Sequence, residues 1–211
     1  AALGADPEAT LAALAPCQDA NAAAVMEALR GLAVTAGTSL SPLFPVAVCR
    51  LVRRTAASGY APASALGVVF FGMFTARGGA GALGMTLGKA ALTLAEVSGD
   101  LAVRSQVTLF AYLYLLHGEV HTAALTAAFD SAYRLGLESG DVSRISESAM
   151  TLCLARLMAG DELGALQAEM ARHADQVARL QQAMTRTYLQ IYQQAVHNLR
   201  EGAQEPGALA G

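Results

Sequence analysis

The sequence predicts an all-α fold, a helical-hairpin solenoid of the tetratricopeptide-like kind with about ten helices. Apolar residues recur with helical periodicity along most of the chain, and strand-like alternation is scarce. The composition is rich in alanine, the residue with the highest helix propensity. Short segments around glycine recur at intervals of 40–41 residues. A two-helix unit repeated at such an interval is typical of an α-solenoid, in which each unit packs on its neighbours.

The boundaries of the predicted helices follow from residues that begin or end helices. Proline suits the first turn, glycine suits the position after the last turn, and aspartate suits the N-cap of the next helix. The residues interpreted in this way are Pro7, Pro42 and Pro62, then Gly59, Gly99, Gly140 and Gly160, and then Asp100, Asp141 and Asp161. The predicted helices span residues 8–14, 20–36, 42–58, 62–77, 82–98, 100–117, 121–139, 141–159, 162–180 and 183–201.

The repeat is most visible at three similar turns that contain Ser-Gly or Ser-Gly-Asp. When the turns are aligned, one small position and an apolar stripe at i, i+4 and i+7 coincide on the helices that follow. The turns are Ser58-Gly59, Ser98-Gly99-Asp100 and Ser139-Gly140-Asp141. The small position is Ala65, Ser105 and Ser146, and the stripe is Val69/Met73/Ala76, Leu109/Leu113/Leu116 and Met150/Leu154/Leu157. The alternative is a non-repeating helical bundle in which these coincidences arise by chance.

Composition limits the class of protein. The chain has 211 residues, of which 54% are hydrophobic and 15% charged, and this excludes an intrinsically disordered chain. The formal net charge of −3 argues against a basic nucleic-acid surface, so we expect no nucleic-acid partner for this domain. We expect a single helical domain over residues 1–202, followed by a tail or linker at residues 203–211.

Cysteine usage and hydropathy bear on the compartment. Cys17, Cys49 and Cys153 are far apart in the sequence, which favours free thiols in a reduced, cytoplasmic protein. The stretch between Arg54 and Arg77 is uncharged, but its continuous apolar part, residues 63–76, is shorter than the ~20 residues that a membrane span needs. We therefore expect a buried helix there and no membrane association.

Two segments have the spacing of chemical sites, and both are predicted to be turns. Residues 79–84 match G-x-G-x-x-G, but the βαβ context that a dinucleotide site requires is missing. His117 and His121 have the spacing of a metal pair, but Gly118 is expected to end the helix between them. In this interpretation His173 and His197 have no Cys, Asp or Glu partner at ligand spacing. Nucleophile-elbow, P-loop and kinase signatures are also missing, so we expect a non-enzyme without catalytic residues, cofactor or metal.

Two sets of residues are candidate binding sites. Arg50, Arg53 and Arg54 lie late in a predicted helix, where they either contact an acidic partner or are favoured by the helix dipole. Arg144 and Glu147, by contrast, are predicted to pair with each other on a helix surface. A candidate apolar pocket between helices would be lined by Phe70, Phe71, Met73, Phe74, Phe110 and Tyr114.

Several runs of residues carry a family resemblance. They are Pro42-Leu43-Phe44-Pro45, Arg50-Leu51-Val52, Ser58-Gly59-Tyr60-Ala61-Pro62-Ala63-Ser64-Ala65, Phe71-Gly72-Met73 and Gly88-Lys89-Ala90-Ala91-Leu92-Thr93-Leu94. Together with the Ser-Gly-Asp steps, these runs resemble the tetratricopeptide-like region that follows the AAA-type ATPase module in large bacterial signalling proteins. The resemblance covers residues 6–201 and departs from the family at the glycine-rich turn of residues 78–84.

The resemblance implies a domain fragment of a longer regulatory protein. In that family a Ser/Thr kinase domain often precedes the ATPase, and a GAF domain with a histidine kinase, or a DNA-binding domain, follows the helices. Because the catalytic residues belong to those flanking domains, none is assigned to this chain. We therefore expect a non-enzymatic helical-repeat module for protein–protein or inter-domain interaction in signal transduction. The alternatives are a small-molecule sensor with the apolar pocket named above, and homodimerisation through an exposed apolar edge.

Overall fold

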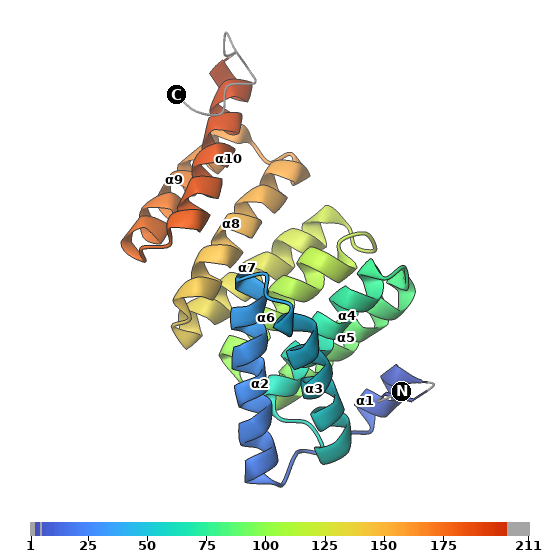
Figure 1. The fold of residues 1–211 in the computed structure, drawn as a ribbon. Helices are drawn as coiled ribbons and strands as arrows, with labels where there is room; N and C mark the ends of the chain where they lie inside the picture. The colour runs from blue at the N-terminus through green and yellow to red at the C-terminus, as the bar shows by residue number, and fades with distance from the viewer. Residues whose placement is uncertain (1–2, 5, 202–211) are drawn as a thin grey trace. The chain divides into compact units, whose positions relative to one another are not determined.

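The computed structural model describes residues 3–4 and 6–201 (Figure 1). Over these residues the fold is all-α, with ten α-helices, one short π-helix and no β-strand, so the predicted fold class is confirmed at that level. The helices are α1 (Pro7–Ala12), α2 (Ala20–Thr38), α3 (Leu43–Ser58), α4 (Pro62–Arg77), α5 (Gly81–Ser98), α6 (Leu101–Ala111), η1 (Tyr112–Leu116), α7 (Thr122–Ser139), α8 (Val142–Ala159), α9 (Leu163–Arg179) and α10 (Ala183–Glu201).

The helix ends confirm most of the predicted caps. Gly99, Gly140 and Gly160 adopt the left-handed conformation directly after α5, α7 and α8. The Asp100 and Asp141 side chains accept hydrogen bonds from backbone N–H groups three residues later, as N-caps do.

The predicted cap at Asp161 is wrong. Its neighbour Glu162 caps α9 by accepting from the N–H groups of Gly164 and Ala165, both at 2.7 Å. Asp161 is engaged elsewhere, because its Oδ2 accepts from Nε of Arg156 at 2.7 Å. The longer glutamate side chain can reach the first N–H groups of α9, which leaves the aspartate free to bind the arginine.

The helix predicted over residues 100–117 is not α-helical throughout. It is α-helical to Ala111 and then forms the π-helix η1. In this segment Leu115 is buried, and its Cδ1 would lie 3.0 Å from a Cβ placed on either Gly72 of α4 or Gly88 of α5. Leu115 therefore occupies a notch formed by two glycines, a contact that helical periodicity alone does not reveal.

The chain divides into two compact units, one ending at Glu119 and one beginning at Val120. In the first unit, α4 packs against α2, α3, α5 and α6. Every residue from Ala63 to Phe70 is buried, which confirms the buried helix predicted in this stretch. Among the described residues, no helix is both long and apolar enough to cross a membrane.

The second unit is built from α7 to α10. Helix α8 packs against α7, α9 and α10, and α9 packs against α10. The apolar core between α8, α9 and α10 contains Cys153, Leu166, Met170, Val177, Leu189 and Val196. A single domain over residues 1–202 stays a prediction, and the predicted tail at residues 203–211 lies outside the described residues.

The predicted turn at residues 79–84 is only partly a turn, because residues 78–80 connect the two helices and residues 81–84 already form the first turn of α5. The helix α4 precedes it, so the strand that a dinucleotide site requires is replaced by helix. Gly79 has φ +92° in the turn, a conformation that favours glycine. Gly84 lies in the first turns of α5 against α4, where a Cβ would be 2.9 Å from the carbonyl oxygen of Gly72. Two of these glycines thus have structural roles in the α4–α5 hairpin.

Candidate functional site

Four of the six residues predicted to line an apolar pocket belong to one chain of ring contacts in the first unit. Phe70 of α4 lies 5.3 Å from Phe110 of α6, measured between ring centroids, and Phe110 lies 6.0 Å from Tyr114 of η1. Phe74, one turn after Phe70, joins through Phe44. Tyr114 is 45% exposed, so the aromatic cluster reaches the surface at that end. Edge-to-face and tilted rings at these distances attract one another and pack stably.

Phe44 is the member of the aromatic cluster that the sequence interpretation missed. Its ring lies 5.3 Å from Phe70 and 5.1 Å from Phe74, and it covers Gly37 at the end of α2. Phe44 belongs to the cluster because of the way α3 crosses α4, and local sequence patterns do not predict how two helices cross. Phe71 and Met73 are half-buried against the same core, but no described ring contact connects Phe71 to the cluster. Whether the cluster admits a ligand stays a prediction.

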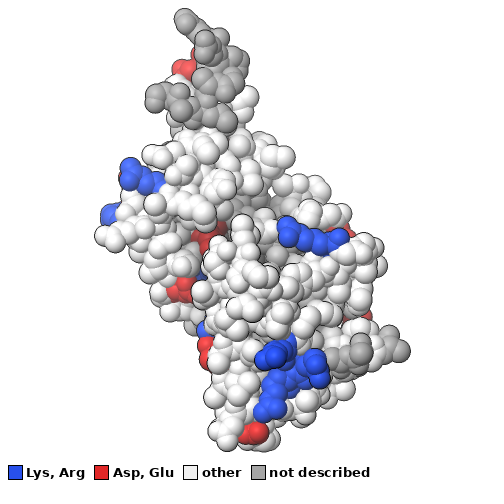
Figure 2. All heavy atoms as spheres, in the orientation of Figure 1, with Lys and Arg blue, Asp and Glu red and all other residues white. Residues whose placement is uncertain are grey.

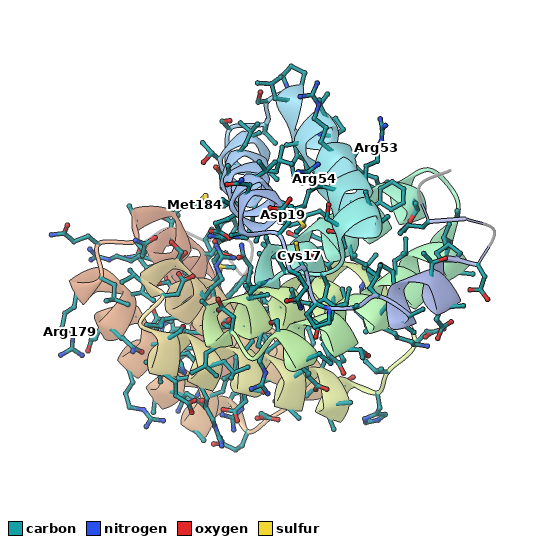
Figure 3. All side chains as sticks on the ribbon, turned by 90° about the horizontal axis from the view of Figure 1, so that it is seen from below. Cys17, Asp19, Arg53, Arg54, Arg179 and Met184 are labelled. Carbon is teal, nitrogen blue, oxygen red and sulfur yellow. The ribbon has the colours of Figure 1, made fainter. Side chains whose placement is uncertain are left out.

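The three predicted partner-contact arginines share the exposed side of α3. Arg50, Arg53 and Arg54 are all exposed, and Figure 2 shows basic side chains gathered over the surface where Figure 1 places α3. In Figure 3 the side chain of Arg53 extends away from its helix. The last turn of α3 contains no basic residue, because the arginines precede it. The helix-dipole interpretation is therefore weakened, since the dipole acts mainly within the last turn.

The second unit contains a polar cluster that sequence reasoning missed. Arg156 of α8 donates from Nε to Asp161 and from Nη1 to Glu169 of α9. One turn further along α9, Nε2 of His173 lies 3.7 Å from Oε1 of Glu169. Glu169 precedes His173 by four residues, so the prediction that this histidine has no acidic partner at ligand spacing is wrong. The i, i+4 spacing on one helix was the available signal.

His173 is buried between α7 and α9. Its ring meets the Tyr133 ring edge-to-face at 5.1 Å, and the Tyr133 hydroxyl donates to Oε1 of Gln176 at 2.7 Å. Burial lowers the pKa of His173 below its usual value, although the Glu169 carboxylate opposes this shift. The nearby Cys153 thiol is fully buried, and burial raises its pKa to about 12, which keeps it protonated and unreactive at neutral pH.

We expect His173 to make the protein less stable in mild acid. Because its pKa is lower in the folded than in the unfolded chain, the unfolded chain binds the proton more tightly, and stability falls as the pH drops below the usual histidine pKa of about 6.5. Urea unfolding of the wild type and of His173→Gln at several pH values measures this effect. The variant should lose less stability on acidification, whereas His197→Gln, at an exposed histidine, should follow the wild type. Equal acid sensitivity in all three proteins would contradict the assignment.

The predicted Arg144–Glu147 pair forms but does not lie on the surface. Nη1 of Arg144 donates to Oε2 of Glu147 at 2.5 Å, and only 7% of the Arg144 side chain is exposed. Burial raises the pKa of Glu147, and the Arg144 guanidinium opposes that shift. The Arg144 end of the pair is therefore buried while 31% of the Glu147 side chain stays exposed, so loss of Glu147 would leave a buried guanidinium without this carboxylate.

The two histidines near the Gly118 turn lie at helix ends. His117 is exposed directly after η1, and His121 is the N-cap of α7, where its Nδ1 accepts from the N–H of Ala123 at 3.2 Å. They are not on one continuous helix, which confirms the prediction of turn histidines. Within residues 3–4 and 6–201, no group of three or more His, Cys, Asp or Glu side chains is arranged to hold a metal ion.

Comparison with known proteins finds no similarity to report: no family model matches the chain, and neither the curated proteins nor the solved structures contain a significant match.

Proposed function

We propose that this chain is a non-enzymatic helical-repeat module, a tetratricopeptide-like solenoid that binds a protein or a neighbouring domain in a bacterial signalling protein. The bacterial and signalling parts of the proposal rest on the family resemblance of its sequence. The helical-repeat part of the proposal is supported by a packing pattern that recurs within the two compact units. In three sets of three consecutive helices, successive helices pack on each other and the first helix also packs on the third. These sets are α2/α3/α4, α4/α5/α6 and α8/α9/α10.

This packing pattern supports a solenoid because stacked hairpins bring alternate helices together as well as successive ones. The aligned small residues Ala65, Ser105 and Ser146 are all buried, as close helix packing requires. The turns at Gly99 and Gly140 share a left-handed glycine followed by a capping aspartate, at a spacing of 41 residues. The recurrence therefore includes contacts and backbone geometry as well as sequence.

The proposal is tested on the reading frame that encodes the chain and on the purified protein. We expect an ATPase module upstream and a kinase or DNA-binding domain downstream, and binding of one of these domains to the chain by calorimetry. A reading frame without such domains would overturn the inter-domain role. Turnover of ATP by the purified chain above a buffer blank would overturn the non-enzymatic assignment.

A small-molecule sensor is the second candidate function, and the aromatic cluster favours it. The cluster joins α3, α4, α6 and η1 and reaches solvent at Tyr114, so an apolar ligand inserted there would contact several helices at once. The test is the melting temperature with and without indole as a small aromatic probe. A rise that Tyr114→Ala reduces would support the sensor, and an unchanged melting temperature would argue against it.

A further inference from the structure

Helix α3 has two chemically different sides. Its buried side packs into the first unit through Ala47, Val48, Leu51, Val52 and Thr55. Its opposite side is exposed and follows a helical stripe with spacings of three and four residues. From the N-terminus this stripe contains Leu43, Val46, Arg50, Arg53 and Ala57, with Arg54 one turn after Arg50. The exposed side is therefore apolar in its first half and basic in its second half.

The basic half carries positive charge that the described chain does not neutralise. None of the three guanidinium groups forms an ion pair with a described residue. Like charges three and four residues apart on a helix repel each other, so this arrangement costs some helix stability. The protein as a whole is acidic, with a formal net charge of −3. A concentrated positive patch on an acidic protein complements a ligand that brings carboxylates.

The apolar half is continued by an unusual leucine. Leu40, in the turn before α3, is 93% exposed, and its backbone has φ +52°, a left-handed conformation that costs energy for a residue with a side chain. Its N–H donates to the carbonyl oxygen of Gly37 in the closing turn of α2, a place where glycine is usual. Leu43 and Val46 are 53% and 49% exposed. Leu43 and Val46 thus present aliphatic side chains to solvent two turns and one turn before Arg50, and Leu40 presents another in the turn that precedes the helix.

We propose that Leu40, Leu43, Val46, Arg50, Arg53 and Arg54, here called the α3 face, bind an acidic amphipathic segment of a partner protein. Apolar side chains at one end of the segment would cover the leucines and the valine, and carboxylates at the other end would pair with the arginines. From Leu43 to Arg54 the face extends for about 16 Å, the length of about eleven helical residues. This inference rests on the proposed interaction function and specifies the partner.

Other polyanions fit the α3 face less well. Nucleic acid would meet three arginines on an otherwise acidic chain, whereas phosphate-driven binding usually uses more basic contacts, and it would leave the aliphatic half without a role. An anionic membrane surface would attract the arginines, but the face offers no aromatic residue for the interface. A protein segment with both apolar and acidic residues would contact all six side chains of the α3 face.

The test uses the full chain and fluorescein-labelled synthetic peptides of about twelve residues, with leucines in one half and glutamates in the other, made in both chain directions. We expect one of them to bind by fluorescence anisotropy at low salt. The double variant Arg50→Glu/Arg53→Glu should weaken binding at least about tenfold. The double variant Arg179→Glu/Arg186→Glu is the matched control, because it makes the same charge change at two exposed arginines of the second unit, and it should leave binding unchanged.

The variant Leu40→Gly separates binding from stability. It removes the exposed side chain and relieves the left-handed backbone, so the melting temperature should rise while binding weakens about threefold or more. Failure of both peptides to bind, or equal binding to all variants, would overturn the inference. Binding of a DNA oligonucleotide or phosphatidylserine vesicles instead of the peptides, or self-association lost in these variants, would also overturn it. The proposed interaction function is tested separately, by binding of the flanking domains to the chain. That function and the present inference can therefore fail independently.

Discussion

Replacing Gly84 with alanine is expected to destabilise the protein by about 1–3 kcal/mol, although alanine normally favours helix over glycine by about 1 kcal/mol. The reason is the contact between α4 and α5. A Cβ on Gly84 would lie 2.8 Å from Cβ of Ala76 and 2.9 Å from the carbonyl oxygen of Gly72. Neither atom belongs to a flexible side chain, so the added methyl can be accommodated only if the two helices move apart.

A matched control for Gly84→Ala exists at Gly31 in α2. A Cβ added there meets nothing within 4 Å, so Gly31→Ala should stabilise the protein by about 0.5–1 kcal/mol through helix propensity alone. Urea unfolding followed by circular dichroism measures both variants against the wild type. Opposite signs are the expected result. Stabilisation by both variants would mean that α4 and α5 are not in close contact at Gly84.

Gly84 also illustrates what the sequence could and could not predict. The recurring turns and helical periodicity located the helices, because those signals are local and each cap involves neighbouring residues. The G-x-G-x-x-G spacing correctly indicates a helix–helix turn at residues 79 and 80, but residue 84 lies within α5, and the requirement for glycine there comes from the crossing of α4 and α5. The two helices pack closely there, and helical periodicity in the sequence does not predict which residues of two helices meet.

The candidate sites show the same limit. Phe44 was missed because its partners Phe70 and Phe74 lie on another helix. Arg144 was assigned to the surface because its i, i+3 spacing from Glu147 is the same for exposed and buried pairs. The Glu169–His173 pair, in contrast, could have been found from its spacing. The spacing does not show that His173 is buried, and burial is what lowers the pKa of this histidine.

Replacing Leu189 with alanine should cost about 2–5 kcal/mol, the range expected when a fully buried leucine is truncated. Leu189 is fully buried on α10, in the core that Met170 and Val177 of α9 share with Cys153 of α8. Truncation removes apolar contact with both helices and leaves a cavity that the packed neighbours can fill only in part. Urea unfolding measures the loss, and amide hydrogen exchange should place it in residues 142–201.

The same substitution at Leu199 tests whether burial is the cause. Leu199 lies on the same helix but is 67% exposed, so Leu199→Ala should change stability by less than about 0.5 kcal/mol. Both variants have the same change in helix propensity, so their difference isolates the packing of α10 onto α8 and α9. Equal small effects would mean that α10 is loosely attached to the second unit. That result would also remove α8/α9/α10 from the recurring packing pattern on which the helical-repeat proposal depends.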